Sequence, residues 1–332
     1  MGDSMVRSFS DKRIRYIVMM CLVALIFVLF NPYTVRAKDD EIKSMNDFYD
    51  KLSAQIMEHN NDASYEVSGA VKDRIMSMEF SDYMAHYNED SPLTSGCYLS
   101  YYLDSIQLYY SHGKLRVLIV YSYTKTEMDE HFAKMNELAE SLKCNEDYET
   151  IQAVHDYLVE HFKYDDRTMF KNHTDIEGFR DGEMVCSGYS LAAYYLLNSA
   201  GIKTRVITGY GGDSSDYTEN HMWNMVQLDN TWYNMDITWD DTEKNNISYM
   251  YFLKSDKDFP MHIRMGSYDT SYFNSIVSDK SYKLPFRLRM GMSIMKWGIL
   301  IAFIIIEAVL LVIRQKKNKK MREIYEQKQT YY

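Results

Sequence analysis

Three side chains in the second half of the chain have the types and order needed for nucleophilic acyl chemistry. Cys186 precedes an apolar run, 191–197, that predicts a buried helix. A cysteine at a helix N-terminus is favoured as the thiolate by unsatisfied N–H groups and the positive end of the helix dipole. His221 could accept the thiol proton, and Asp236 could orient the imidazole. Taken alone, a cysteine beside an apolar helix is equally typical of an unreactive core thiol.

The segment that carries His221 and Asp236 predicts a β-hairpin. Two strand-like runs, 221–228 and 231–239, flank an Asp-Asn pair that is typical of a two-residue turn. In this register Trp223 faces Asp236, and His221 is a diagonal neighbour of Asp236 on the same face. The opposite face collects the apolar side chains Met222, Val226, Leu228, Tyr233, Met235 and Ile237. One register therefore serves both the chemistry and the packing.

The same residues resemble the transglutaminase-like superfamily, in particular its bacterial surface proteins. The resemblance runs from about residue 147 to about residue 268. It rests on Gly182-x-x-x-Cys186-Ser-Gly-Tyr, Gly201-Ile202, His221-Met-Trp-Asn and Trp232-Tyr-Asn-Met-Asp236-Ile-Thr-Trp-Asp240. It implies that Cys186 is the nucleophile, that His221 is its base, and that Asp236 orients the imidazole.

The resemblance also implies a fold and a reaction. The fold would be α+β with a papain-like core, in which the helix bearing Cys186 packs on an antiparallel sheet bearing His221 and Asp236. The thiolate would attack an acyl carbon of a peptide, protein or cell-wall substrate, with the backbone N–H of Cys186 as an oxyanion donor. The thioester would pass to water, as in a cysteine peptidase or amidase, or to an amine, as in a protein-glutamine acyltransferase.

Three aromatic residues are candidates for substrate binding. Tyr164 belongs to a Tyr-Asp pair of the kind that lies near the site in this family, and Trp223 and Trp239 are neighbours of the catalytic positions. The two tryptophans could shield a thioester from water, or they could simply be part of the core. The alternative function is a non-catalytic binding or scaffolding module of the same family at the cell surface.

Composition and motifs argue against other partners. The formal net charge of −10 argues against nucleic-acid binding. The sequence has no HExxH, no CxxC and no glycine-rich phosphate loop, so we expect neither a metal nor another cofactor. His155 and His161 lack metal-ligand spacing and are expected to be solvated or to lie at the edge of the core. Cys97 and Cys144 could form a disulfide, or they could both remain thiols.

Both ends of the chain predict membrane segments. Residues 1–37 combine early basic residues with a short apolar run and are typical of a signal peptide or an N-terminal anchor. Residues 294–313 predict a transmembrane helix, and the basic tail 314–332 is expected in the cytoplasm. The body of the chain would then lie outside the cytoplasm, at the cell membrane. Glu307 within the span indicates either a transmembrane partner or a protonated carboxyl.

The remaining chain divides into two expected domains. Residues 38–143 predict a small α/β lead-in domain, and 144–286 form the transglutaminase-like domain. The elements expected in the lead-in domain are a helix at 40–60, an acidic irregular stretch to 96, strand-like runs at 97–110 and 115–124, and a helix at 125–142. A further strand is expected at 249–253.

Overall fold

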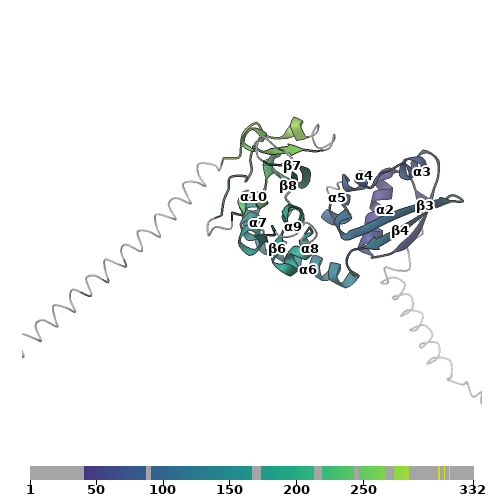
Figure 1. The fold of residues 1–332 in the computed structure, drawn as a ribbon, viewed down its shortest axis with the longest axis horizontal. Coiled ribbons are helices and arrows are strands. Elements are labelled where there is room, and N and C mark those ends of the chain that lie inside the picture. The colour runs from purple at the N-terminus through teal and green to yellow at the C-terminus, as the bar shows by residue number, and fades with distance from the viewer. Residues whose placement is uncertain are drawn as a thin grey trace, which may run out of the picture.

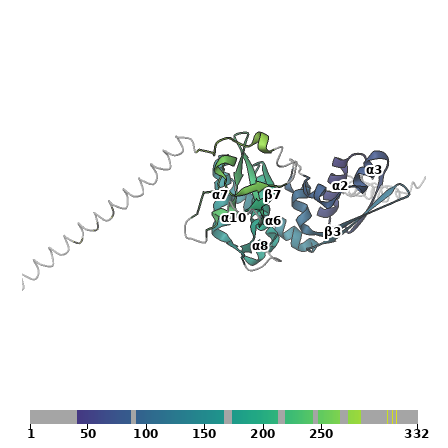
Figure 2. The ribbon, with the colours of Figure 1, turned by 45° about the horizontal axis from the view of Figure 1, so that its top comes forward.

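The computed structural model describes the stretches 41–86, 91–166, 173–212, 219–242, 247–265 and 273–283, together with the single positions 306, 310 and 314. The chain mixes helices and sheets, as predicted. Its N-terminal part, purple to blue in Figure 1, lies beside the teal-to-green part that carries Cys186. The view turned by 45° shows the same side-by-side arrangement (Figure 2).

The predicted membrane segments fall outside this description. Residues 1–37 and, apart from three isolated helical positions, residues 294–332 are not among the described residues. Within the part of the chain that is described, no helix combines the length and the apolar character needed to cross a membrane.

The N-terminal part is built on a four-stranded sheet with the strand order β1-β2-β4-β3. Its strands are β1 (Glu41–Ile42), β2 (Asp62–Val67), β3 (Leu103–Ser111) and β4 (Lys114–Tyr121), and its helices are α2 (Met45–Met57), α3 (Gly69–Met76), α4 (Phe80–Met84) and α5 (Gly96–Leu99), with 3-10 turns η1 (Pro92–Thr94) and η2 (Ser100–Tyr102). The helix α2 and the β3–β4 hairpin agree with the prediction, except that residues 97–102, predicted as the start of the first strand, belong to α5 and η2. The stretch predicted as irregular instead contains β2, α3 and α4, which are too short to show a sustained hydrophobic period.

The second part begins with the predicted helix α6 (Lys125–Leu142), followed by α7 (Asp147–His161) and α8 (Asp175–Asp181). Capping fixes the start of α6. The Glu127 backbone N–H donates to the Thr124 hydroxyl at 3.3 Å, and the Glu127 carboxylate accepts from the Thr124 N–H at 2.8 Å. This reciprocal pair satisfies two N–H groups that a helix start leaves unpaired.

The second sheet has the order β10-β7-β8-β9, and all its pairs are antiparallel. Its strands are β7 (Thr204–Gly211), β8 (Glu219–Leu228), β9 (Thr231–Met235) and β10 (His262–Arg264). The β8–β9 register is the predicted one, with Leu228 opposite Thr231 and Asn224 opposite Met235. Asp229 and Asn230 have φ angles of 53° and 59°, as a two-residue hairpin turn requires.

The helix α9 (Cys186–Ser199) is the centre of this part. Its apolar run is buried throughout, and Figure 1 shows it with α6, α7 and α8 around it. At its end Gly201 has a φ of 96°, and the N–H of Ile202 donates to the Leu197 carbonyl at 2.8 Å. This is a Schellman motif, in which glycine adopts the left-handed conformation at no steric cost. The prediction that Gly201 ends this helix is therefore confirmed.

The helix α9 packs on one face of the second sheet. That face carries Val226, Tyr233 and Met235, which belong to the main hydrophobic core. A hydrogen bond from the Asn224 amide to the Ser190 carbonyl, at 3.0 Å, joins β8 to α9 within this core. The other face of the sheet is covered by residues of the 247–283 region and forms a second, smaller cluster with Ile207, Trp223, Met225, Trp232, Tyr251, Phe259 and Phe273. The sheet is thus buried on both faces.

A buried carboxylate joins the two parts of the molecule. Asp175, the first residue of α8, is fully buried and accepts hydrogen bonds from the hydroxyls of Tyr98 and Tyr102, each at 2.5 Å. His131 on α6 lies 3.0 Å from the same carboxylate. The main hydrophobic core also continues from the N-terminal sheet into α9. The predicted boundary at 143/144 therefore does not coincide with a break in the core.

Candidate active site

Cys186 lies at the start of α9, where the sequence placed it. It is the first helical residue and is partly exposed, and its neighbour Val185 makes no side-chain capping bond. The N–H groups of the first helical turn lack intrahelical acceptors, and the helix dipole is positive at this end. The start of α9 therefore favours negative charge on the Cys186 sulfur and on an oxygen bound beside it.

The strand β8 brings His221 to this thiol. The side chain of His221 is 7% exposed, and its Nε2 lies 2.8 Å from the Asp236 carboxylate. Because Nε2 is engaged there, Nδ1 is the nitrogen left for Cys186. Burial lowers the pKa of His221, but the Asp236 carboxylate and a hydrogen bond with Cys186 outweigh it and raise the pKa to about 10.

Asp236 contacts His221, but it lies in a different secondary-structure element from the one predicted. The strand was expected to continue to Trp239. Instead β9 ends at Met235, and Asp236 is the N-cap of the short helix α10 (Ile237–Asp240). One carboxylate oxygen accepts from the Trp239 backbone N–H at 3.3 Å, which turns the chain out of the sheet. The other oxygen remains for His221.

The Asp236 carboxylate is buried but well compensated. Its side chain is 1% exposed. Burial raises its pKa, but His221 and a second histidine, His262, outweigh that effect and lower the pKa to about 2. The carboxylate is therefore charged over the whole range in which His221 changes its protonation state.

His262 was not predicted from the sequence. It opens the three-residue strand β10, and its Nε2 lies 3.0 Å from the same oxygen of Asp236 that His221 contacts. Such a short strand gives no periodic signal. Its approach to β7 also depends on a glycine, since a Cβ on Gly209 would lie 2.1 Å from the Ile263 carbonyl oxygen and 2.6 Å from the Trp223 ring.

His221, Asp236 and His262 also meet the distance requirement for a cation site. One ligand atom from each lies within 4.8 Å of the others. The two N–O distances, 2.8 and 3.0 Å, are ordinary lengths for charge-assisted hydrogen bonds. The two histidines therefore compensate the negative charge of Asp236 without an ion. The same atoms could hold zinc, which accepts two histidines and a carboxylate as ligands.

A pocket of about 570 Å³ opens beside these groups. It is lined by Tyr164, Asp166, Glu219, Thr238, Trp239, Asp241, Thr242 and Tyr251. The Trp239 ring lies 5.2 Å from the His221 ring, centroid to centroid, so the pocket adjoins the candidate base. Its carboxylates favour neutral or positively charged groups over anions.

Two of the three aromatic candidates line this pocket. Tyr164 lies in β5 (Lys163–Tyr164), which pairs with β6 (Glu183–Met184) directly ahead of Cys186. Burial and the nearby Cys186 raise the pKa of Tyr164 to about 12. Tyr164 and Trp239 line the pocket. Trp223 is 1% exposed and lies in the smaller core cluster beside His221, so the structure does not bring it to the pocket.

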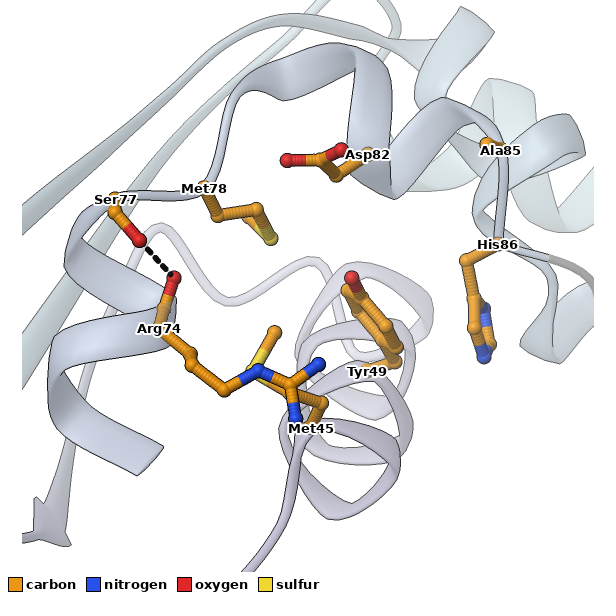
Figure 3. A pocket seen from close by; sticks show the side chains of 8 residues that line it. All are labelled: Met45, Tyr49, Arg74, Ser77, Met78, Asp82, Ala85 and His86. Carbon is orange, nitrogen blue, oxygen red and sulfur yellow. Dashed lines mark hydrogen bonds between the residues drawn. The ribbon is translucent and has the colours of Figure 1, made fainter. Parts of the chain in front are cut away.

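A larger pocket, of about 680 Å³, lies in the N-terminal part, away from Cys186. It is bounded by α2, α3 and α4, and Figure 3 shows Arg74 and Asp82 at its edge with Tyr49 and His86 beside them. The rings of Tyr49 and His86 have centroids 4.3 Å apart. None of the candidate catalytic residues lines it.

Cys97 and Cys144 are both free thiols, which is one of the two states that the sequence left open. Other expectations from the sequence need correction. The expected strand at 249–253 is a turn, with Leu253 at a φ of 50°. His155, expected to be solvated or at the edge of the core, is fully buried and contacts the carboxylates of Asp156 and Asp240. Its burial is compensated by an acidic neighbour in sequence and by a second carboxylate that is distant in sequence and close in the fold.

A family model and curated relatives match part of the chain. The sequence model described as the Transglutaminase-like superfamily matches residues 136–237. Kyphoscoliosis peptidase from Mus musculus and from Homo sapiens are each 28% identical to this chain over 137 residues, which cover 35% of this chain and 20% of the relative. The matched region thus spans about a fifth of these curated relatives.

Two solved structures with local similarity have low overall scores. A TGase has a TM-score of 0.30 and 17% identity, over 41% of this chain and 44% of that chain. Legionella pneumophila LapG has a TM-score of 0.29 and 14% identity, over 43% of this chain and 74% of that chain.

Proposed function

Because residues 136–237 are a transglutaminase-like domain, we propose that the protein is a thiol enzyme that acts on acyl or amide bonds through Cys186, His221 and Asp236. The observation that carries the proposal is the chain of contacts at the start of α9. His221 hydrogen-bonds to Cys186 through one side of its ring and to a buried carboxylate through the other. This is the arrangement by which an imidazole activates a thiol.

The reaction follows from these contacts. His221 Nδ1 takes the proton of Cys186, and the sulfur attacks the acyl carbon to form a C–S bond and a tetrahedral oxyanion. The N–H groups at the start of α9 stabilise that oxyanion. His221 then returns the proton to the departing amine as the C–N bond breaks, which leaves a thioester. Water or a second amine, deprotonated by His221, attacks the thioester and restores the thiol.

The pocket suggests which substrates are accepted. Tyr164 and Trp239 offer aromatic surface next to the reacting groups, while Asp166, Glu219 and Asp241 give the pocket negative charge. We propose a peptide, protein or cell-wall segment as the acyl donor, and an amine or water as the acceptor. The acidic lining favours a positively charged amine.

We further propose that the domain is held at the cell membrane outside the cytoplasm. The proposal rests on the sequence of the two ends, with basic residues next to each apolar run. A substrate at the cell surface would then be within reach of the site.

A mass-spectrometric screen of the full-length protein tests the activity. The protein is incubated with peptides and cell-wall fragments, with and without a primary amine. We expect thioester adducts on Cys186, and products that are absent with the Cys186→Ala variant. If Cys186 reacts with thiol reagents but no product forms, the tested peptides and cell-wall fragments do not include a substrate. A Cys186 that reacts with thiol reagents no faster than Cys144, an exposed cysteine of the same chain, would favour the non-catalytic binding module.

A further inference from the structure

The geometry points to His262 as a positioning residue that holds the Asp236 carboxylate for His221 by donating a second hydrogen bond to it. This inference rests on the proposed function of Cys186, His221 and Asp236, and it adds a fourth residue to that group.

Both nitrogens of His262 face groups that can only accept. Nε2 lies 3.0 Å from the Asp236 carboxylate, and Nδ1 lies 2.9 Å from the Pro260 carbonyl oxygen. A carboxylate accepts and cannot donate, so the contact with Asp236 is made by an N–H on Nε2 of His262. The contact between Nδ1 and the Pro260 carbonyl holds the other side of the ring.

The surroundings of His262 hold its ring in place. Its side chain is 1% exposed. Four aromatic rings surround the imidazole: Phe259 at 3.9 Å, Trp239 at 4.3 Å, Trp223 at 5.0 Å and Tyr251 at 5.6 Å between centroids. The Phe259 ring stacks on the imidazole, and the other three rings are tilted or edge-on to it, so the ring of His262 is packed on several sides.

Other charges near His262 are few among the described residues. His221 shares its carboxylate, and the Tyr251 hydroxyl belongs to one of the surrounding rings. On its own strand, Arg264 forms an ion pair with Asp256. The strand β7 places the uncharged Gly211 opposite His262. Asp236 is therefore the carboxylate that receives the His262 N–H.

The consequence concerns the orientation of Asp236. One of its oxygens is fixed by the cap of α10, and the other accepts from both histidines. With His262 in place, the carboxylate cannot turn without breaking two bonds. Without it, the oxygen that meets His221 is held by His221 alone, and the thiol–imidazole pair loses its fixed geometry. A residue of this kind acts through Asp236 and does not touch the substrate.

Two crossed substitutions separate this role from simple packing. His262→Gln places an amide N–H near the position of Nε2 but removes the ring. His262→Phe keeps a ring among the aromatic neighbours but removes both N–H groups. The readout is the alkylation rate of Cys186 in the full-length protein with iodoacetamide, followed by peptide mass spectrometry across pH 5 to 10. Cys144 in the same sample is the internal control.

We expect His262→Phe to slow Cys186 alkylation at pH 7 by about tenfold, which corresponds to about 1.4 kcal/mol, and His262→Gln to remain close to the wild type. Equal rates for all three proteins, or a slow Gln variant with a normal Phe variant, would overturn the inference. If wild-type Cys186 reacts no faster than Cys144, it is the proposed function that fails. A zinc-binding role predicts another pattern: the rate would change with EDTA or added zinc in the wild type only.

A measurement on the unsubstituted protein covers the case in which neither variant folds. Long-range ¹⁵N–¹H spectra of histidine-labelled full-length protein at pH 7 report whether each ring nitrogen carries a proton. The inference requires that Nε2 of His262, assigned by its contacts with Phe259 and Trp239, carries a proton. An Nε2 without a proton would overturn it.

Discussion

His155 on α7 and Asp240 on α10 are joined by a 3.2 Å hydrogen bond between two fully buried side chains. Asp240 is the last residue of the four-residue helix that Asp236 caps, and it also accepts from the backbone N–H of Tyr251 at 3.1 Å. The Asp236 carboxylate is thus fixed through its own contacts at one end of α10, while His155 fixes the other end. A helix this short has little stability of its own and depends on such contacts.

The His155–Asp240 pair predicts a stability that depends on pH. Burial by itself lowers the pKa of His155, but hydrogen bonds with Asp156 and Asp240 outweigh it, so the folded-state pKa is raised. The extra stability is complete below the unfolded pKa of about 6.5 and is lost as the pH rises through the folded value. We expect His155→Gln to lower the free energy of unfolding by about 3 kcal/mol at pH 6, and by less at alkaline pH.

Urea unfolding of the full-length protein at pH 6 and pH 9 measures this effect. His161→Gln is the matched control, because His161 is exposed on the same helix and bonds only to the Tyr157 carbonyl among the described residues. A loss for His155→Gln that grows from pH 6 to pH 9 would contradict the assigned charge of His155.

Substitution of Asp236 by asparagine should preserve the fold and change the titration of His221. The amide still fits the cap of α10, but it removes the negative charge that raises the pKa of His221 to about 10. We expect the alkaline limb of the Cys186 alkylation profile to move to lower pH by at least about one unit, which corresponds to 1.36 kcal/mol. Asp104→Asn, an exposed substitution, should leave the profile in place. An unchanged alkaline limb in Asp236→Asn would show that His221 is not its source.

Removal of the proposed nucleophile should cost little stability. Cys186 is partly exposed at the N-terminal end of α9, and the buried residues of the helix stay packed without its thiol. We expect Cys186→Ala to abolish adducts with acyl donors and to change the free energy of unfolding by about 1 kcal/mol or less. Cys144→Ala should keep the adducts. Acyl transfer that persists in Cys186→Ala would remove Cys186 from the mechanism.

Asp175 should be essential for joining the N-terminal sheet to α8. Its burial raises its pKa, but His131, Tyr102 and Tyr98 outweigh that effect and lower it. The resulting stability is present above the unfolded pKa of about 3.9 and is lost as the pH falls through the folded value. We expect Asp175→Ala to cost about 3 kcal/mol or more, measured by urea unfolding at pH 7.

A milder substitution tests the same cluster. Tyr98→Phe removes one hydroxyl donor to Asp175 and should cost about 1–3 kcal/mol. Tyr109→Phe serves as the control, because Tyr109 is 53% exposed on β3. Equal effects of the two tyrosine substitutions would argue against a buried, ionised Asp175.

The proposed topology is tested in intact cells. If the body of the chain lies outside the cytoplasm, added protease should remove it and leave the basic tail 314–332 protected. An epitope tag at each end and immunoblotting distinguish the fragments. Cleavage of the tail with protection of the body would reverse the proposed orientation.

The sequence determined the elements whose signals are local. The apolar run after Cys186 defined α9, Gly201 marked its end, and the Asp-Asn turn set the β8–β9 register. These features depend on helical periodicity, on the freedom of glycine at positive φ and on turn geometry, and all of them can be read within a few residues. The predicted register also brought His221 near Asp236. The predicted second strand ended at Trp239, four residues beyond the observed end of β9 at Met235.

The tertiary structure decided which distant polar groups meet. His262 lies 26 residues beyond Asp236 and contacts the same carboxylate, and Asp240 lies 85 residues beyond His155. Neither pairing has a periodic or spacing signal, because the three-residue strand β10 and the four-residue helix α10 are too short to produce one. Burial makes these pairings obligatory, since an unpaired charge in the core is costly. Only the folded chain shows which partner each buried charge has.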